Sequence, residues 1–296
     1  MGQSETVQMG IIAKRSAIAQ AVGDRWASRG LGVIEIKEGQ AIPDKVAGLA
    51  IDPGSPIDEG SMDLERFRGT LQEAVKARVA RVGIISSALT MAREEGGGRV
   101  FDESFRPVPG DEVRGSAMER AVWREGELYR WIAKGLDAVM INPTVVVGED
   151  QWGEELELIA GTLEGVLLPA LLEGVEVGVV RQSDVAQALV VAMDRGRRGR
   201  RYLVSGGEME VGKALEALVE GRGGRVPRRR WNAQRFIRAT NWIPDCELKE
   251  RLLRLAGMDG QRRLVEMRGR GRGERCAGEL MVEPLDVGPP ETVLSR

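Results

Sequence analysis

Solid apolar runs alternate with amphipathic stretches along the first half of the chain, and this alternation constrains the fold most. The apolar runs at 7–12, 33–36, 46–51, 82–85 and 138–147 are each typical of a strand that is buried on both faces. Such strands, separated by helices, form parallel sheets covered on both sides. The sequence therefore predicts the α/β class, with a doubly wound parallel sheet whose ligands lie beyond the carboxyl ends of the strands.

Three helices are predicted between these strands, at 16–29, 64–78 and 116–134, because apolar side chains recur there at helical spacing. Gly30 stands where a glycine commonly ends a helix. Residues 92–115 are polar and are predicted to form a loop.

The pattern loosens after residue 148, where shorter elements are predicted. They are helices at 156–172, 183–194 and 211–219 and strands at 175–180 and 202–204. We expect a first domain over 1–150 and a C-terminal lobe over 151–296 that shares part of its chain with the sheet and carries an Arg/Gly-rich tail.

The chain has no histidine, and this absence excludes several classes of catalytic site. Ser-His-Asp and Cys-His nucleophiles and histidine-ligated metals are ruled out. The two cysteines, Cys246 and Cys276, have no metal-binding spacing and read as unpaired thiols, so no metal site is expected. No apolar run is long enough to span a bilayer, and the N-terminus lacks the pattern of a signal peptide, which favours a cytoplasmic protein.

Charge is distributed unevenly along the chain. Residues 195–275 hold 22 Lys and Arg against 10 Asp and Glu, whereas residues 1–194 hold 20 against 31. The arginines gather in clusters at 195–201, 222–230 and 262–275. Solvated loops are one interpretation, and an anionic partner such as a nucleotide-sugar, RNA or another polyanion is the other.

Three ordered motifs resemble the NAD-dependent epimerase/dehydratase family, the extended short-chain dehydrogenase/reductases. They are Arg68-Gly69-Thr70-Leu71 followed by the strand that ends in Ser86-Ser87, then Gly135 to Gly148 with Asn142-Pro143-Thr144, and then Ser183-Asp184-Val185-Ala186 leading to Arg201-Tyr202-Leu203. The resemblance implies a Rossmann domain with a small C-terminal lobe, and NAD(P) as the cofactor.

The glycine loop that holds the dinucleotide diphosphate in this family is altered here. Its three glycine positions correspond to Ala13, Ser16 and Ala19. A Cβ at each position obstructs the approach of a diphosphate, although the helix N-terminus and the neighbouring basic pair 14–15 remain attractive to an anion. Residual dinucleotide binding and a plain strand–helix turn both stay open.

The adenosine side of the implied site is also shortened. Lys37 follows the second strand, where it could favour a 2′-phosphate or simply lie at the surface. Only nine residues separate Ile36 from the next strand at Val46, where the family normally fits a helix and another strand.

Of the family's catalytic Ser, Tyr and Lys, only the serine has a match in this chain. Ser87 matches the serine, with Ser86 beside it and Ser116 in the Tyr-Lys motif, but Val113 replaces the tyrosine and Ala117 the lysine. The chain's two tyrosines, Tyr129 and Tyr202, do not fit the motif. Glu112 and Glu119 are the acidic side chains nearest to the missing pair, and nothing in the sequence singles out either as a replacement.

The loop Asn142-Pro143-Thr144 corresponds to the one that lies along the nicotinamide ribose in the family. It fits either a retained pocket or a retained turn. Asp184 reads as a helix N-terminal charge.

Two functional hypotheses follow. The first is a non-catalytic descendant that serves as a structural, assembly or regulatory subunit. The second is a divergent NAD(P)-dependent epimerase, dehydratase or reductase acting on a sugar nucleotide or similar alcohol. A protein partner or a homodimer is expected, because the family often pairs through the helices at 64–78 and 116–134. Trp123 and Trp131 are candidates for that contact or for the core.

Overall fold

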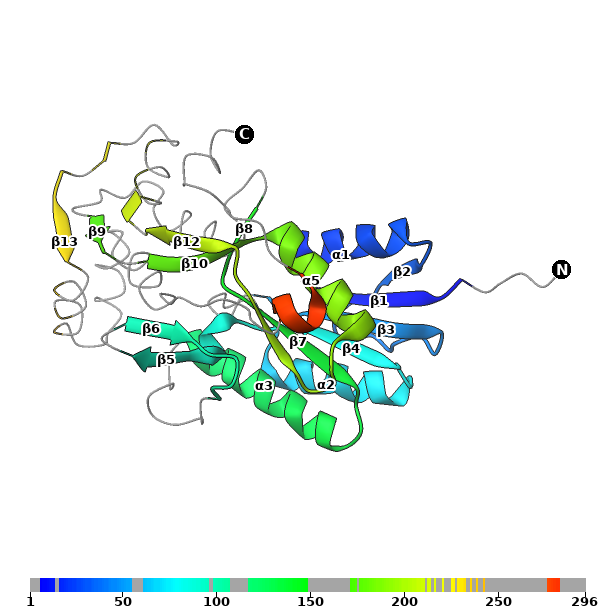
Figure 1. The fold of residues 1–296 in the computed structure, drawn as a ribbon. Helices are drawn as coiled ribbons and strands as arrows, with labels where there is room; N and C mark the ends of the chain where they lie inside the picture. The colour runs from blue at the N-terminus through cyan, green and yellow to red at the C-terminus, as the bar shows by residue number, and fades with distance from the viewer. Residues whose placement is uncertain are drawn as a thin grey trace.

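The computed structural model describes residues 6–13, 16–54, 61–95, 98–106, 117–148, 171–174, 176–210, 228–232 and 276–282, with a few isolated positions between 212 and 242. Its centre is a six-stranded sheet in the order β2-β1-β3-β4-β7-β11, and every neighbouring pair is parallel (Figure 1). The strands are β1 (Gln8–Ala13), β2 (Gly32–Glu35), β3 (Val46–Asp52), β4 (Arg81–Ile85), β7 (Ala138–Pro143) and β11 (Arg201–Val204). The predicted doubly wound α/β class is confirmed.

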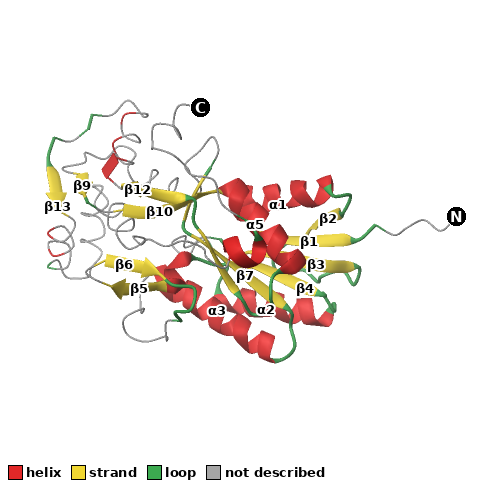
Figure 2. Cartoon of the chain, in the orientation of Figure 1, coloured by secondary structure: helices red, strands yellow, loops and turns green. Residues whose placement is uncertain are grey.

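Helices cover both faces of this sheet (Figure 2). On one face lie α1 (Ala17–Ser28) and α5 (Gln182–Arg195), and on the other lie α2 (Leu64–Lys76) and α3 (Ala117–Ala133). Each helix pair buries its apolar stripe in a separate hydrophobic cluster, one on either side of the sheet. The four corresponding helix predictions are confirmed, and Gly30 has the positive φ of 76° expected after a helix end.

The connection from β2 to β3 contains no helix. Residues 36–45 run instead over the face of β1, where Ile36 and Ile42 are buried. A Cβ added to Gly10 of β1 would lie 3.0 Å from the Ile36 side chain, so the loop packs directly on the strand. Strand β2 is consequently the edge of the sheet, and the switch in strand order falls between β1 and β3.

The chain leaves the main sheet at Thr144. A single strand was predicted over 138–147, and this prediction is wrong, because β7 ends at Pro143 and β8 (Val145–Val147) joins a second sheet. That sheet has the order β12-β10-β8, with β10 (Glu176–Arg181) parallel to β8 and antiparallel to β12 (Gly207–Glu210). Proline has no N–H to continue a ladder, and the Thr144 N–H is bound by the Val204 carbonyl.

Two further predictions are corrected. The polar loop over 92–115 begins with an antiparallel hairpin of β5 (Ala92–Glu95) and β6 (Gly98–Phe101), because Ala92 and Phe101 pair and are buried. The helix predicted to end at 172 overlaps β9 (Leu171–Glu173), which pairs with β13 (Arg230–Asn232), and residues 156–170 lie outside the described residues.

The last described segment packs on the face of the main sheet that α1 and α5 cover. The short π-helix η2 (Cys276–Leu280) packs against α5 and β11, and Leu280 and Val282 are buried in the cluster shared by α1 and α5. The domain boundary near 150 stays a prediction. In the part of the chain that the structure describes, no helix is both long and apolar enough to cross a membrane.

Candidate functional site

The carboxyl ends of β1 and β3 flank the point where the strand order switches, which is where doubly wound folds bind ligands. Ala13, the last residue of β1, pairs in register with Asp52, the last residue of β3. Helix α1 follows β1, with Ser16 as its N-cap. Three predicted positions, Ala13, Ser16 and Ala19, therefore lie together here.

Ser16 is already used to cap α1. It has an extended backbone, and its hydroxyl oxygen accepts a hydrogen bond from the Ala19 N–H at 3.3 Å. Only 8% of Ser16 is exposed. The serine thus satisfies one of the free N–H groups of the helix start, a role that Ser, Thr, Asp and Asn commonly perform.

Asp52 is a buried carboxylate beside this cap, and it is not among the predicted site residues. It is 7% exposed and accepts a hydrogen bond from the Gly54 N–H at 3.0 Å. Burial raises the pKa of the Asp52 carboxyl, against the opposing effects of hydrogen bonds from the Ser16 side chain and Gly54 and of the Arg124 charge.

Arg124 of α3 acts on Asp52 through its charge and is itself 6% exposed. Its guanidinium donates to the Ser61 hydroxyl at 2.8 Å, to the Gly54 carbonyl at 3.3 Å and to the Met62 carbonyl. Burial, with a contribution from the nearby Arg120 charge, lowers the pKa of Arg124 to about 10. These acceptors are all uncharged, and the carboxylates that act on Arg124 through their charges are Asp52, Asp63 and Glu38, of which Asp52 is buried.

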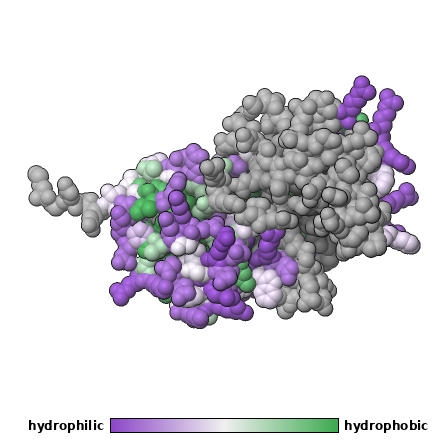
Figure 3. All heavy atoms as spheres, turned by 180° about the vertical axis from the view of Figure 1, so that it is seen from behind, coloured by the Kyte–Doolittle hydropathy of each residue, from purple (hydrophilic) through white to green (hydrophobic). Residues whose placement is uncertain are grey.

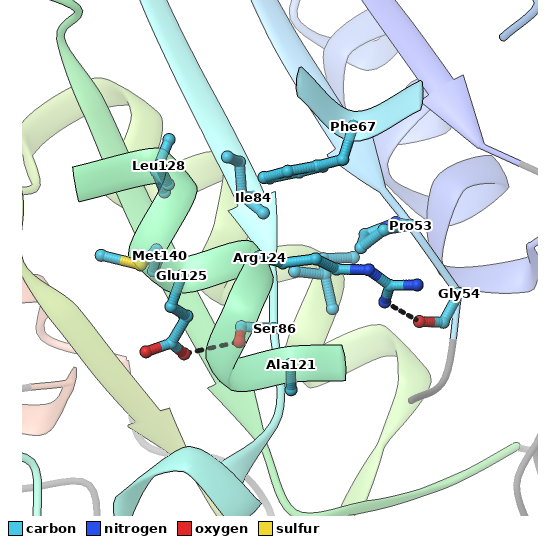
Figure 4. A pocket seen from close by; sticks show the side chains of 11 residues that line it. Pro53, Gly54, Phe67, Ile84, Ser86, Ala121, Arg124, Glu125, Leu128 and Met140 are labelled. Atoms are coloured by element: carbon cyan, nitrogen blue, oxygen red, sulfur yellow. Dashed lines mark hydrogen bonds between the residues drawn. The ribbon is translucent and has the colours of Figure 1, made fainter. Parts of the chain in front are cut away.

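A small pocket opens between β4, α2 and α3 (Figure 4). Its walls are mostly apolar, with Phe67, Ile84, Leu128 and Met140 among the side chains that form them. Polar groups enter it from Ser86, Arg124 and Glu125. The free space in this pocket is about that of one water molecule.

Glu125 is the centre of the polar network in this pocket. Its carboxylate accepts hydrogen bonds from the Ser86 hydroxyl at 2.6 Å, the Thr90 hydroxyl at 2.7 Å and the Asn142 amide at 2.7 Å. Glu125 is 6% exposed. Two residues that the sequence assigned to the cofactor site, Ser86 and Asn142, are therefore brought together by a carboxylate that it did not single out.

Arg201 of β11 supplies the counter-charge. Its guanidinium lies 3.2 Å from the second Glu125 oxygen, and both side chains are almost fully buried, at 2% and 8% exposure. Arg201 also donates to the carbonyls of Thr90, Glu103 and Phe105. The pair joins α3 to β11, the edge strand of the sheet, although the two residues are 76 positions apart in the sequence.

Of the other predicted residues, Ser87 joins this network through its carbonyl, which accepts from the Asn142 amide at 3.0 Å and the Thr90 hydroxyl at 2.9 Å. Ser87 is buried and caps the short helix η1 (Ala88–Met91), accepting from the Leu89 N–H. Pro143 and Thr144 form the exit from the main sheet, and Thr144 is bound to Val204. Lys37 is exposed beyond β2.

The catalytic-motif positions fall at the start of α3. Ala117 is the first residue of that helix, while Val113, Ser116 and Glu112 lie outside the described residues. Glu119 is half-buried and accepts from the Trp123 indole at 3.5 Å, so it lies apart from the Glu125 network. Among the described residues, no cluster of acidic or cysteine side chains could hold a metal ion.

The two tyrosines are placed elsewhere. Tyr129 follows Glu125 by one helical turn and has the Arg106 guanidinium 4.4 Å above its ring. Tyr202 lies on the other side of the sheet, in the cluster of α1 and α5. Its hydroxyl accepts from the Arg197 N–H at 2.9 Å and donates to Glu279 at 3.0 Å, and burial raises its pKa.

A dinucleotide fits these residues poorly. The family places its diphosphate at the N-terminus of α1, where Ser16 already caps the helix and Asp52 adds a buried carboxylate. On the adenosine side, β2 is an edge strand followed only by the loop 36–45.

Comparison with known proteins supports the family resemblance. No family model matches the chain. The sterol demethylase protein B of Methylococcus capsulatus (strain Bath) is 30% identical over 216 residues, which cover 72% of this chain but only 63% of that protein. The chain thus spans less than two thirds of this relative.

Solved structures share the fold across nearly the whole chain. A nucleoside-diphosphate-sugar epimerase from Pseudomonas aeruginosa is 17% identical, with a TM-score of 0.68 over 97% of this chain and 95% of its own. A yeast methylglyoxal/isovaleraldehyde reductase in complex with NADPH is 16% identical, with a TM-score of 0.63 over 97% and 96%. The predicted resemblance in fold is confirmed.

Proposed function

We propose that this chain, which has the fold of the extended short-chain dehydrogenase/reductases of the NAD-dependent epimerase/dehydratase family, is a non-catalytic protein that serves as a structural, assembly or regulatory subunit. The observation that carries the proposal is the position of its tyrosines. Neither Tyr129 nor Tyr202 lies at the start of α3, where the family's Tyr-Lys pair belongs, and Ala117 stands in place of the lysine.

The environment of Tyr202 also argues against a catalytic role. A tyrosine that exchanges a proton near neutral pH needs a lowered pKa, which the family's lysine provides. Burial acts on Tyr202 in the opposite direction, and its hydroxyl is already bound to Glu279. Any NAD(P) bound by this fold would therefore lack a proton donor of the usual kind. In this proposal NAD(P) is also at most a weak ligand.

A divergent NAD(P)-dependent epimerase, dehydratase or reductase is the second candidate. The contact between Glu125 and Ser86 favours it, because a carboxylate and a hydroxyl in a pocket can transfer a proton. The arrangement around Glu125 weighs against it, since Ser86, Thr90, Asn142 and Arg201 already occupy both carboxylate oxygens.

The proposed subunit needs a protein partner or a second copy. Trp123 and Val75 are exposed on α3 and α2, at 41% and 43%, which keeps this helix pair as a candidate contact surface. Trp131 is half-buried and packs against the core, with the Lys134 ammonium 4.7 Å from its ring. Seen from behind, the described surface is mostly hydrophilic, with a hydrophobic area near the N-terminal end (Figure 3).

The first arginine cluster contributes less to an anionic partner than its sequence suggests. Arg201 pairs with Glu125, Arg195 donates to the Leu280 carbonyl, and Arg198 donates to the Ile132 carbonyl. An anionic partner therefore depends mainly on the clusters at 222–230 and 262–275, most of which lie outside the described residues.

A turnover assay tests the proposal. The full chain is incubated with NADH or NADPH and a panel of aldehydes, ketones and nucleotide-sugars, and loss of the reduced nicotinamide absorbance is followed. We expect no consumption above the protein-free rate, and no difference between the wild type and Tyr129→Phe or Tyr202→Phe. Saturable turnover that Ser86→Ala or Glu125→Gln abolishes would overturn the proposal and establish the second candidate.

A further inference from the structure

Asp52 lies near the N-terminus of α1, where this fold usually binds the anionic part of a ligand. In doubly wound proteins the diphosphate of a dinucleotide lies at the N-terminus of the first helix, where free N–H groups and the helix dipole favour negative charge. In this chain the end of β3 brings its own carboxylate to that place, in register with the end of β1. The Ser16 hydroxyl caps α1 and also hydrogen-bonds to Asp52, so the helix start and the carboxylate are directly linked.

The carboxylate is held firmly in this position. Only 7% of Asp52 is exposed, and the Gly54 N–H binds it at 3.0 Å. Gly54 has a φ of 79°, a left-handed conformation that suits glycine, and its N–H is the donor to Asp52. The local chain is thus shaped to bind the Asp52 carboxylate.

The charged side chain that acts on Asp52 from another element is Arg124 of α3. The two act on each other through their charges, and the hydrogen bonds of Arg124 go to the chain segment that follows Asp52, at Gly54, Ser61 and Met62. The charge of Arg124 is therefore partly balanced from within the chain.

We propose that Asp52 is a specificity-determining residue that keeps diphosphates away from the N-terminus of α1. Two like charges a few ångströms apart in a poorly hydrated site repel strongly, so a dinucleotide diphosphate cannot take the usual place while Asp52 is ionised. This inference rests on the proposed function, because it identifies the group that prevents the fold's usual cofactor from binding.

Replacing the charge alone tests the inference. Asp52→Asn keeps an oxygen for the Gly54 N–H and removes the negative charge, so NADH and inorganic pyrophosphate should bind at least about tenfold more tightly, or about 1.4 kcal/mol. Binding is measured by calorimetry on the full chain at low and moderate salt, after thermal melting confirms that the variant is folded.

Two variants serve as controls. Asp52→Glu keeps the charge, and Asp194→Asn removes the same charge from an exposed pair with Arg29 near the opposite end of α1. Neither should gain affinity. The inference fails if folded Asp52→Asn binds no better than the wild type, or if Asp194→Asn gains as much. Turnover by the wild type would instead contradict the proposed function, so the two failures are distinguishable.

Discussion

Glu125 and Arg201 form an ion pair in the described core, and its energetics follow from its burial. Removing two charges from water is costly, and that cost is offset only while both partners remain. Here both Glu125 oxygens receive donors, and Arg201 has carbonyl acceptors as well as the carboxylate. Asn142 is less satisfied, because its side-chain oxygen is buried and has no hydrogen-bond partner.

Breaking this pair should therefore cost far more than breaking a surface pair. We expect Glu125→Gln to lower the free energy of unfolding by about 3–5 kcal/mol, because it leaves the Arg201 charge buried without a counter-charge. Lys76→Gln, which breaks an exposed pair with Glu73, should cost less than about 1 kcal/mol. Urea denaturation followed by circular dichroism measures both, and equal losses would show that the buried pair has no special role.

The position of Glu125 in the sequence indicates a paired carboxylate, although Glu125 is not among the predicted site residues. Glu125 lies on the apolar stripe of α3 with Val122 and Leu128, where a charged residue must be either exposed by a bend or paired. Its partner was not predictable, because Arg201 is distant in sequence and the pairing depends on how β11 joins the sheet. Asp52 follows a buried strand directly, and only the register of β3 with β1 showed that it faces the helix start.

Among the elements, those with strong periodicity were predicted well and those built from non-local contacts were not. The main helices have regular apolar spacing, and most strands of the main sheet are continuous apolar runs. The β5–β6 hairpin has little apolar content, and η2 follows an Arg/Gly-rich stretch, so neither carried a pattern. The division of 138–147 into two strands depends on the pairing of β8 with β10, which lies further along the chain.

The segment around η2 is expected to stabilise the main layer. Leu280 is fully buried against α5 and β11, whereas its neighbour Met281 is 70% exposed. We predict that Leu280→Ala lowers the free energy of unfolding by about 2–5 kcal/mol, as for other buried leucines. Met281→Ala should change it by less than about 0.5 kcal/mol. A matching small loss for both variants in chemical denaturation would mean that η2 is not part of the cooperative core.

At the scale of the whole molecule, we propose that the chain keeps the sheet and helices of the short-chain dehydrogenase/reductase fold but not its dinucleotide site. The retained parts are the ones that bury apolar surface, such as the clusters on both faces of the sheet. The altered parts are the helix start at Ser16, the carboxylate of Asp52 and the shortened connection after β2.

Calorimetric titration of the wild-type full chain with NADH and NADPH, at low and moderate salt, tests this claim most directly. The account predicts no saturable binding at moderate salt, with a Kd weaker than about 1 mM, which corresponds to less than about 4 kcal/mol of binding free energy. Any binding seen at low salt should weaken as salt rises, because it would arise from screened contacts with arginines. Stoichiometric micromolar binding that withstands moderate salt would contradict the proposal and show that the site still accepts the dinucleotide that the fold implies.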